Sequence, residues 1–136
     1  MSEAIEVALA WQRASNEADR ERLLALSAEA LAITGPRGTT RGREEVLAWL
    51  DRAGLQLRAV RLFAREGRVV VAQVGRWRDP ATGVLGDERP LATLFEVAAG
   101  RVVALARHGD LADALAAGGL QLTDEIPLPA MEHLAD

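Results

Sequence analysis

The chain contains no cysteine, and although 16 of its 136 residues are basic, none of these is lysine. Without cysteine, neither a disulfide framework nor a thiolate metal site can form. The first ten residues, MSEAIEVALA, carry acids where a secretory signal has a basic stretch. The apolar runs are strand-sized, far short of the roughly 20 residues that span a bilayer. These absences predict a cytoplasmic protein with no membrane role.

Histidine is also scarce, since only His108 and His133 occur. A metal site with several histidine ligands is therefore excluded, and a mixed carboxylate site would have to be assembled from scattered acids. No G-x-S-x-G sequence marks a serine nucleophile, and the loop GPRGTTRGR lacks the Gly-Lys-Ser/Thr ending of a phosphate-binding P-loop. We expect no metal and no cofactor.

The net charge of −4 argues against a nucleic-acid partner, because a negative domain repels the phosphate backbone. The arginines of the predicted strands do not form a continuous basic face. Arg58 and Arg61, for example, have opposite parity and point to opposite faces of a strand. The length of 136 residues fits one domain with one hydrophobic core.

Three N-terminal segments show apolar residues at helical spacing. The first runs from Ser2 to Ser15 and is centred on Trp11, and the second follows Asp19, a good N-cap residue type. The third begins near Arg43 with acids in its first turn, and Gly54 ends its pattern. We expect three helices before the main strands.

The remaining pattern is that of strands. Residues Ala30 to Ile33 predict a short strand, followed by a loop to Gly42. Between Leu55 and His108, alternation and β-branched content predict four consecutive strands, interpreted as an antiparallel meander. A short helix from 111 to 117 follows. The fold class is therefore α+β, with three N-terminal helices packed on an antiparallel sheet and a short C-terminal helix.

Short sequence segments at characteristic places carry a family resemblance. In chain order they are WQRASNEAD, Gly42-Arg43-Glu44, Glu66-Gly67-Arg68-Val69-Val70, Phe95 with Gly100-Arg101-Val102, and His108-Gly109-Asp110-Leu111. With the order of elements, they resemble the cone-shaped fold of nuclear transport factor 2 and ketosteroid isomerase, most closely the SnoaL-like polyketide cyclases. The resemblance covers residues 1 to about 120. It implies a strongly curved sheet wrapped around the helices, an apolar pocket inside the cone and often a homodimer.

The resemblance divides the chain into a domain, residues 1–120, and a C-terminal tail, residues 121–136. The tail has no periodic apolar face, so we expect deletion after Gln121 to change the melting temperature little. The strand segments 69–74 and 91–97 are apolar on both faces, and such strands need a second cover. This predicts a homodimer formed through the sheet.

The end of the last predicted strand holds the candidate catalytic residues, His108 and Asp110. The resemblance implies that a carboxylate, with or without a histidine, moves a proton next to a carbonyl, which needs a base whose pKa burial has raised. His108 could act at the rim if the strand face that it shares with Val102, Ala104 and Ala106 is turned into the cone. The alternatives are a structural or ligand-orienting histidine, and an N-cap role for Asp110.

The absence of tyrosine excludes the Tyr-plus-acid device of ketosteroid isomerase, and no counterpart of the Asp-Arg-Asp set of limonene epoxide hydrolases is found. The residues predicted to line a ligand pocket are all the aromatic residues of the chain: Trp11, Trp49, Phe63, Trp77 and Phe95. Most of them would also serve in packing, and Trp77 is the candidate for the pocket mouth. Two functions remain open: a domain that binds a hydrophobic or polyketide-like compound, with or without proton-transfer catalysis, and a noncatalytic binding or dimerisation module.

Overall fold

The computed structural model of the chain describes residues 3–35 and 38–128, without the side chains of residues 49–53. Helix α1 (Glu3–Asn16) forms where the spacing predicts it and buries a face that is apolar except for Gln12 and Ser15. Helix α2 (Arg20–Ala25) follows Asp19, whose side chain accepts a hydrogen bond from the Arg22 backbone N–H at 3.1 Å. Helix α3 (Glu44–Ala53) ends at Gly54, which has a left-handed φ of 53°. The three predicted helices are confirmed.

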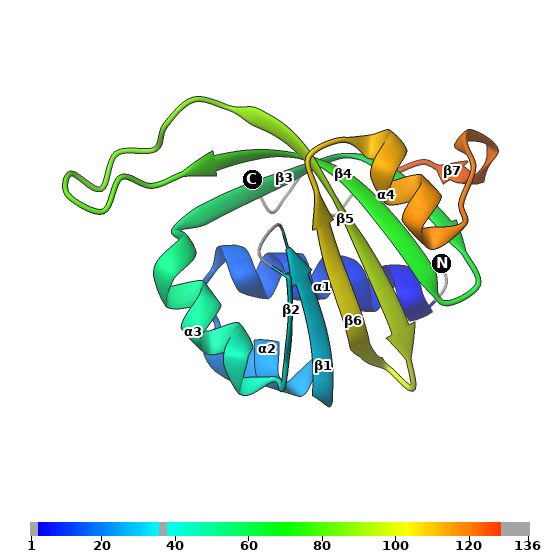
Figure 1. Cartoon of the computed structure of the whole chain (residues 1–136), viewed down its shortest axis with the longest axis horizontal. Helices are drawn as coiled ribbons and strands as arrows, with labels where there is room; N and C mark the ends of the chain where they lie inside the picture. The colour runs from blue at the N-terminus through cyan, green and yellow to red at the C-terminus, as the bar shows by residue number, and fades with distance from the viewer. Residues whose placement is uncertain (1–2, 36–37, 129–136) are drawn as a thin grey trace.

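Seven strands form one sheet, which curves over α1 (Figure 1). In chain order they are β1 (Ser27–Gly35), β2 (Gly38–Arg41), β3 (Leu55–Arg65), β4 (Arg68–Trp77), β5 (Arg89–Ala98), β6 (Arg101–His108) and β7 (Glu125–Ile126). Their order in the sheet is β2-β1-β6-β5-β4-β3-β7. The predicted four-strand meander corresponds to β3–β6 and is antiparallel throughout.

The segment between α2 and α3 differs from the prediction. Strand β1 is longer than the predicted run, and the predicted loop contains β2, which forms a hairpin with β1. Strand β1 also pairs with β6 in parallel, so the sheet is antiparallel except at this pair. All four residues of β2 are exposed. Because β2 has no buried face, hydrophobic periodicity could not indicate it.

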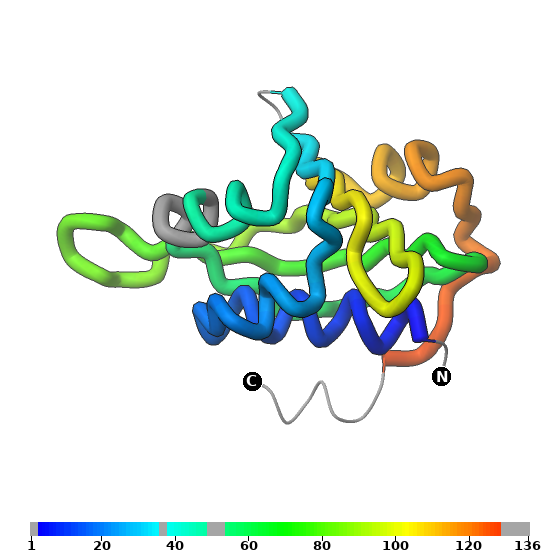
Figure 2. Tube along the Cα trace, turned by 90° about the horizontal axis from the view of Figure 1, so that it is seen from below, coloured from blue at the N-terminus to red at the C-terminus, as the bar shows by residue number. Residues whose placement is uncertain are grey.

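Different helices cover the two faces of the sheet (Figure 2). On the concave face, α1 packs against a core that includes Val71, Phe95 and Leu105. On the opposite, convex face lies α4 (Leu111–Gly118), whose Leu115 packs with Val70. The chain itself therefore supplies part of the second cover that the apolar strands require.

After α4 the chain returns to the sheet. A 3-10 turn, η1 (Leu122–Asp124), leads into β7, which pairs with β3. Arg61 of β3 donates two hydrogen bonds to the Glu125 carboxylate, at 2.7 and 3.0 Å. Ile126 and Leu128 pack against the concave core. The first half of the predicted tail is therefore docked on the sheet, although it has no periodic apolar face and was expected to be dispensable for folding. Residues 129–136 lie outside the described residues.

One side chain closes part of the edge of β3. Asn16, the last residue of α1, donates to the Leu57 carbonyl at 2.7 Å and accepts from the Leu57 N–H at 2.9 Å, as a neighbouring strand would. Gln56 donates to the Asn16 carbonyl at 3.1 Å. These bonds fix the end of α1 against the sheet and satisfy backbone groups that an open edge leaves exposed.

Candidate functional site

Three buried polar side chains form a hydrogen-bonded row between α1 and the concave face. Gln73 of β4 donates from its amide to Oε1 of Gln12 on α1 at 2.5 Å, and Thr93 of β5 donates its hydroxyl to Oε1 of Gln73 at 2.8 Å. Each side chain is at most 2% exposed. Burying amides and hydroxyls is costly unless they are hydrogen-bonded, and these bonds offset that cost. We call these three residues the polar row.

Arg107 adds a positive charge to the same face. It is the direct register partner of Thr93 on β6, and such partners point to one face with Cβ atoms about 4.5–5.5 Å apart. Burial lowers the pKa of Arg107 to about 10, because removal from water disfavours the charged guanidinium. At neutral pH the side chain is still protonated, so the concave side of the sheet contains a largely buried cation beside the polar row.

The chemistry of this group is binding and polarisation. Amide and hydroxyl groups donate hydrogen bonds to an oxygen atom, and a guanidinium stabilises negative charge. None of these four side chains can accept a proton near neutral pH, as a general base must. The arrangement therefore favours holding the oxygen-bearing end of a ligand.

The two predicted catalytic residues lie away from this group. His108 is the register partner of Ala92, which belongs to the cluster under α4 on the convex face. A catalytic role for His108 at the rim required its strand face to turn into the cone. In the structure, the face that turns into the cone carries the neighbouring residue, Arg107, instead. The Nε2 atom of His108 is buried and has no hydrogen-bond partner. Asp110 is exposed, and its Oδ1 accepts the Asp113 N–H at 2.8 Å, so it caps α4.

A β-bulge explains why parity failed at this strand. The register between β5 and β6 shifts between Glu96 and Val97, so that Val97 pairs with Val102 while Glu96 pairs with Ala104. Val102 therefore lies in the concave core with Leu105, although the two are an odd number of positions, three, apart. A bulge inserts one residue and reverses the faces beyond it. Val102 and His108 were predicted to share a face, and the bulge separates them.

Two of the predicted pocket aromatics pack together in the concave core. Trp11 and Phe95 meet edge to face, with ring centroids 5.8 Å apart, and each is 1% exposed. The Trp11 indole N–H donates to Oγ of Ser27 at 3.0 Å, and Ser27 in turn donates to the Leu23 carbonyl at 2.6 Å. These contacts join α1, α2, β1 and β5.

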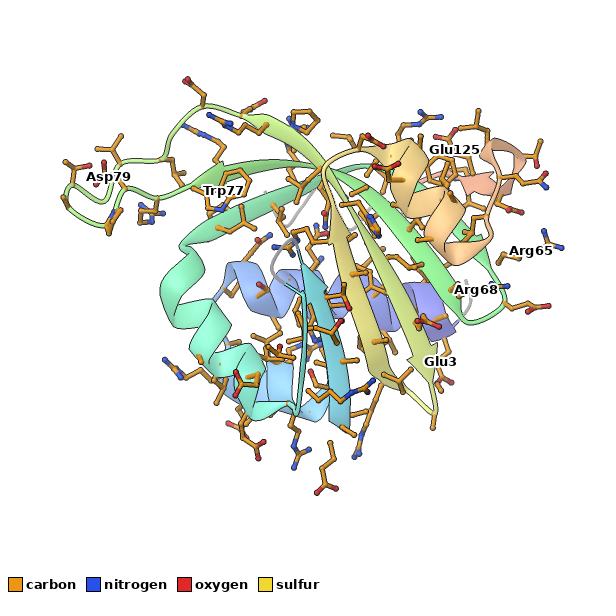
Figure 3. All side chains as sticks on the ribbon, viewed as in Figure 1. Glu3, Arg65, Arg68, Trp77, Asp79 and Glu125 are labelled. Atoms are coloured by element: carbon orange, nitrogen blue, oxygen red, sulfur yellow. The ribbon has the colours of Figure 1, made fainter. Side chains whose placement is uncertain are left out.

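The other predicted pocket aromatics lie elsewhere. Phe63 belongs to the cluster under α4 on the convex face. Trp77 is 40% exposed and lies at the root of the long β4–β5 loop, far from Glu125 at the other end of the sheet (Figure 3). The side chain of Trp49 lies outside the described residues. The four aromatic side chains that the structure describes are therefore spread over both faces and the rim of the sheet.

Two surface hollows accompany these features. One, of about 600 Å³, lies between the end of α1, strands β3 and β4 and the β4–β5 loop. Two arginines of its lining, Arg76 and Arg78, donate to backbone carbonyls of that loop at 2.8 and 2.6 Å, which anchors the loop to β4. The other, of about 410 Å³, is an apolar groove between α4 and the segment that follows it, lined by residues such as Leu111, Leu115 and Leu122.

Residues 3–35 and 38–128 contain neither a metal-binding cluster nor a membrane-spanning helix. In that part of the chain, no three His, Asp or Glu side chains lie close enough together to hold a metal ion. No helix there is both long and apolar enough to cross a membrane.

Sequence reasoning missed the polar row. Glutamine and threonine carry no charge and match no catalytic motif, so composition and motif searches pass over them. The signal in the sequence is the place of these residues along their strands. Gln73 lies in the run VVVAQV, on the same strand face as Val69 and Val71. Thr93 lies in the run LATLF, on the same strand face as Leu91 and Phe95. A polar residue at a core position is the informative exception in such a strand.

Comparisons with known proteins identify the fold. No family model and no curated protein matches the chain. An NTF2-like protein of unknown function from Burkholderia pseudomallei matches with a TM-score of 0.70 and 22% identity, covering 85% of this chain and 97% of that one. A putative SnoaL-like polyketide cyclase from Shewanella putrefaciens gives 0.70 and 15%, covering 87% and 86%. TerC, co-crystallised with polyporic acid, gives 0.69 and 19%, covering 86% and 98%. The chain has the NTF2-like α+β cone fold, as its sequence predicted.

Proposed function

We propose that this chain is a small-molecule-binding domain that holds a hydrophobic, polyketide-like compound between α1 and the concave face. The observation that carries the proposal is the polar row with Arg107, set in an otherwise apolar face. Buried charges and amides are often no more stable than well-packed apolar residues of the same volume. Their presence at core positions fits a functional use better than a folding requirement.

The apolar surroundings suit such a ligand. Along β5, Thr93 lies between Leu91 and Phe95, which belong to separate hydrophobic clusters. Leu91 forms its cluster with Leu55 and Leu57, at the end of the sheet nearer the β4–β5 loop. A ligand in this place would meet apolar walls on both sides of a polar centre, which is the usual composition of small-molecule sites. The ligand of TerC, a protein of the same fold, supports a small-molecule role.

A proton-transfer enzyme is the second candidate, with His108 as acid or base and Asp110 beside it. The observation that favours it is the buried Nε2 of His108, which makes no hydrogen bond. Buried polar groups are rarely left in this state outside functional sites. In this version the substrate would have to reach the sheet from the convex side, near the start of α4.

Two further parts of the proposal come from the sequence. We propose that the protein acts in the cytoplasm and forms a homodimer through the convex side. The sequence argument for the dimer was an uncovered apolar face, and α4 covers part of that face. The apolar groove between α4 and the segment that follows it, with Leu122 64% exposed, is the surface now available for such a contact.

The proposed function is tested by NMR titration with N-phenyl-1-naphthylamine, a neutral aromatic probe. We expect the largest shift changes at the side-chain amides of Gln12 and Gln73 and at Thr93. Shift changes confined to the groove around Leu115 and Leu122 would contradict binding in the cone. Shift changes centred on His108 and α4's first turn would favour the second candidate.

A further inference from the structure

Resting on the proposed function, we infer that the ligand enters the cone with a negatively charged oxygen group, such as a carboxylate or an enolate, which is held beside Arg107 and Thr93. Two properties of the ligand follow, its negative charge and its orientation. The anionic oxygen lies at the polar row, and the apolar body lies against the leucine cluster of Leu55, Leu57 and Leu91.

The charge distribution on the sheet supports an anion. The structure describes every residue of strands β4, β5 and β6. Among the charged side chains that these strands turn to the concave face, only Arg107 is not exposed. The acid of these strands, Glu96, pairs with Arg68 and Ala104 on the convex face and is exposed. The whole chain carries a net charge of −4, which repels anions in general. A preference for anions would therefore have to originate at this one position.

The donor set suits an oxygen anion. A guanidinium has five N–H donors in a planar fork, so Arg107 can serve a ligand oxygen in addition to any protein acceptor. The hydroxyl of its register partner Thr93 lies on the same face, but its single hydrogen is donated to Oε1 of Gln73, so Thr93 orients that amide and is not itself a donor to the anion. The Gln73 amide carries two hydrogens, and the bond to Gln12 uses one of them. The two groups with a further hydrogen to donate, the Gln73 amide and the Arg107 guanidinium, lie on β4 and β6.

Burial makes the interaction strong and specific. Coulomb attraction grows as the local dielectric falls, and salt screens buried charges much less than exposed ones. The environment of Arg107 disfavours its charged form, which the lowered pKa records. An anion placed beside the guanidinium would offset part of this cost, whereas a neutral ligand would not. The site should therefore discriminate by charge even at high salt.

Two fluorescent probes that differ by one anionic group test the inference: 1-anilinonaphthalene-8-sulfonate and the neutral N-phenyl-1-naphthylamine. In 0.5 M NaCl we expect the wild type to bind the sulfonate at least tenfold more tightly. Arg107→Met should weaken sulfonate binding at least tenfold and change binding of the neutral probe less than twofold. Arg101→Met, which removes an exposed arginine of the same strand, is the matched control and should change neither.

The outcomes separate the inference from the proposed function. Equal affinity of the wild type for both probes, or unchanged sulfonate binding by Arg107→Met, would overturn the anion inference and leave binding in the cone intact. Failure to bind either probe would overturn both. If Arg107→Met does not fold, competition on the wild type decides: naphthalene-2-carboxylate should displace the neutral probe at least tenfold better than naphthalene-2-carboxamide, and equal displacement would overturn the inference.

Discussion

Thr93 and Arg107 are direct register partners on β5 and β6, and their shared face is the one that α1 covers. The next pair along these strands, Ala92 and His108, belongs to the face under α4. A strand residue changes face with every step along the chain. The offset of one residue between Arg107 and His108 therefore places a guanidinium on the concave side, and not an imidazole. A guanidinium is a binding group rather than a base.

The polar row should respond to mutation as a connected network. Gln73→Leu leaves Oε1 of Gln12 and the hydroxyl of Thr93 without their partner, so we expect a loss of about 1–3 kcal/mol in the free energy of unfolding by urea. The double variant Gln12→Leu/Gln73→Leu removes both amides and should recover part of this loss. A single variant as stable as the wild type would show that the row contributes nothing to folding.

Arg107 predicts a dependence of stability on alkaline pH. Its folded-state pKa is lowered to about 10, below that of the unfolded chain, so from about pH 10 upward the unfolded state binds more protons and stability rises with pH. The chain has no lysine, tyrosine or cysteine to titrate in this window. Compared with Arg107→Met, the wild type should gain unfolding free energy between pH 9 and pH 11. Parallel curves for the two proteins would contradict the burial of this charge.

Asp110 should behave as a helix cap. Because its carboxylate accepts the Asp113 N–H, Asp110→Ala should cost about 1 kcal/mol, while Asp110→Asn, which keeps a good capping group, should cost almost nothing. Thermal unfolding of the two variants provides the measurement. If turnover of some substrate is found and Asp110→Asn abolishes it, Asp110 is a base and the proton-transfer candidate gains.

The C-terminal segment should contribute to stability, contrary to the expectation from sequence. Deletion after Gln121 removes β7 together with the packing of Ile126 and Leu128, so we expect the melting temperature to fall by roughly 5 °C or more. Thr123→Ala, which changes an exposed side chain of the neighbouring turn, is the control and should have little effect. An unchanged melting temperature after the deletion would restore the original expectation.

Local patterns sufficed for much of this fold. The helix α1 around Trp11, the caps at Asp19 and Asp110, the stop at Gly54 and the meander β3–β6 each follow from residues near in sequence. Strands β2 and β7 could not be predicted in this way. Both are short, and β7 exists because β3 offers it an open edge, which depends on the folded sheet.

The site was harder to predict, because it depends on which face of each strand is turned inward. Both parities of β6 carry apolar residues, so periodicity alone could not choose between Arg107 and His108. The bulge near Val102 then reversed the faces within the strand. The pairing register between β5 and β6, which depends on contacts distant in sequence, determines that Arg107 faces inward.

A crystal structure of the protein with naphthalene-2-carboxylate tests the central claim most directly. We expect the naphthalene ring on the concave side, against Leu91 and its cluster, with a carboxylate oxygen about 3 Å from the Arg107 guanidinium. Density for the probe confined to the groove between α4 and the segment after it, or a concave side closed by side chains with the probe bound elsewhere, would contradict this claim.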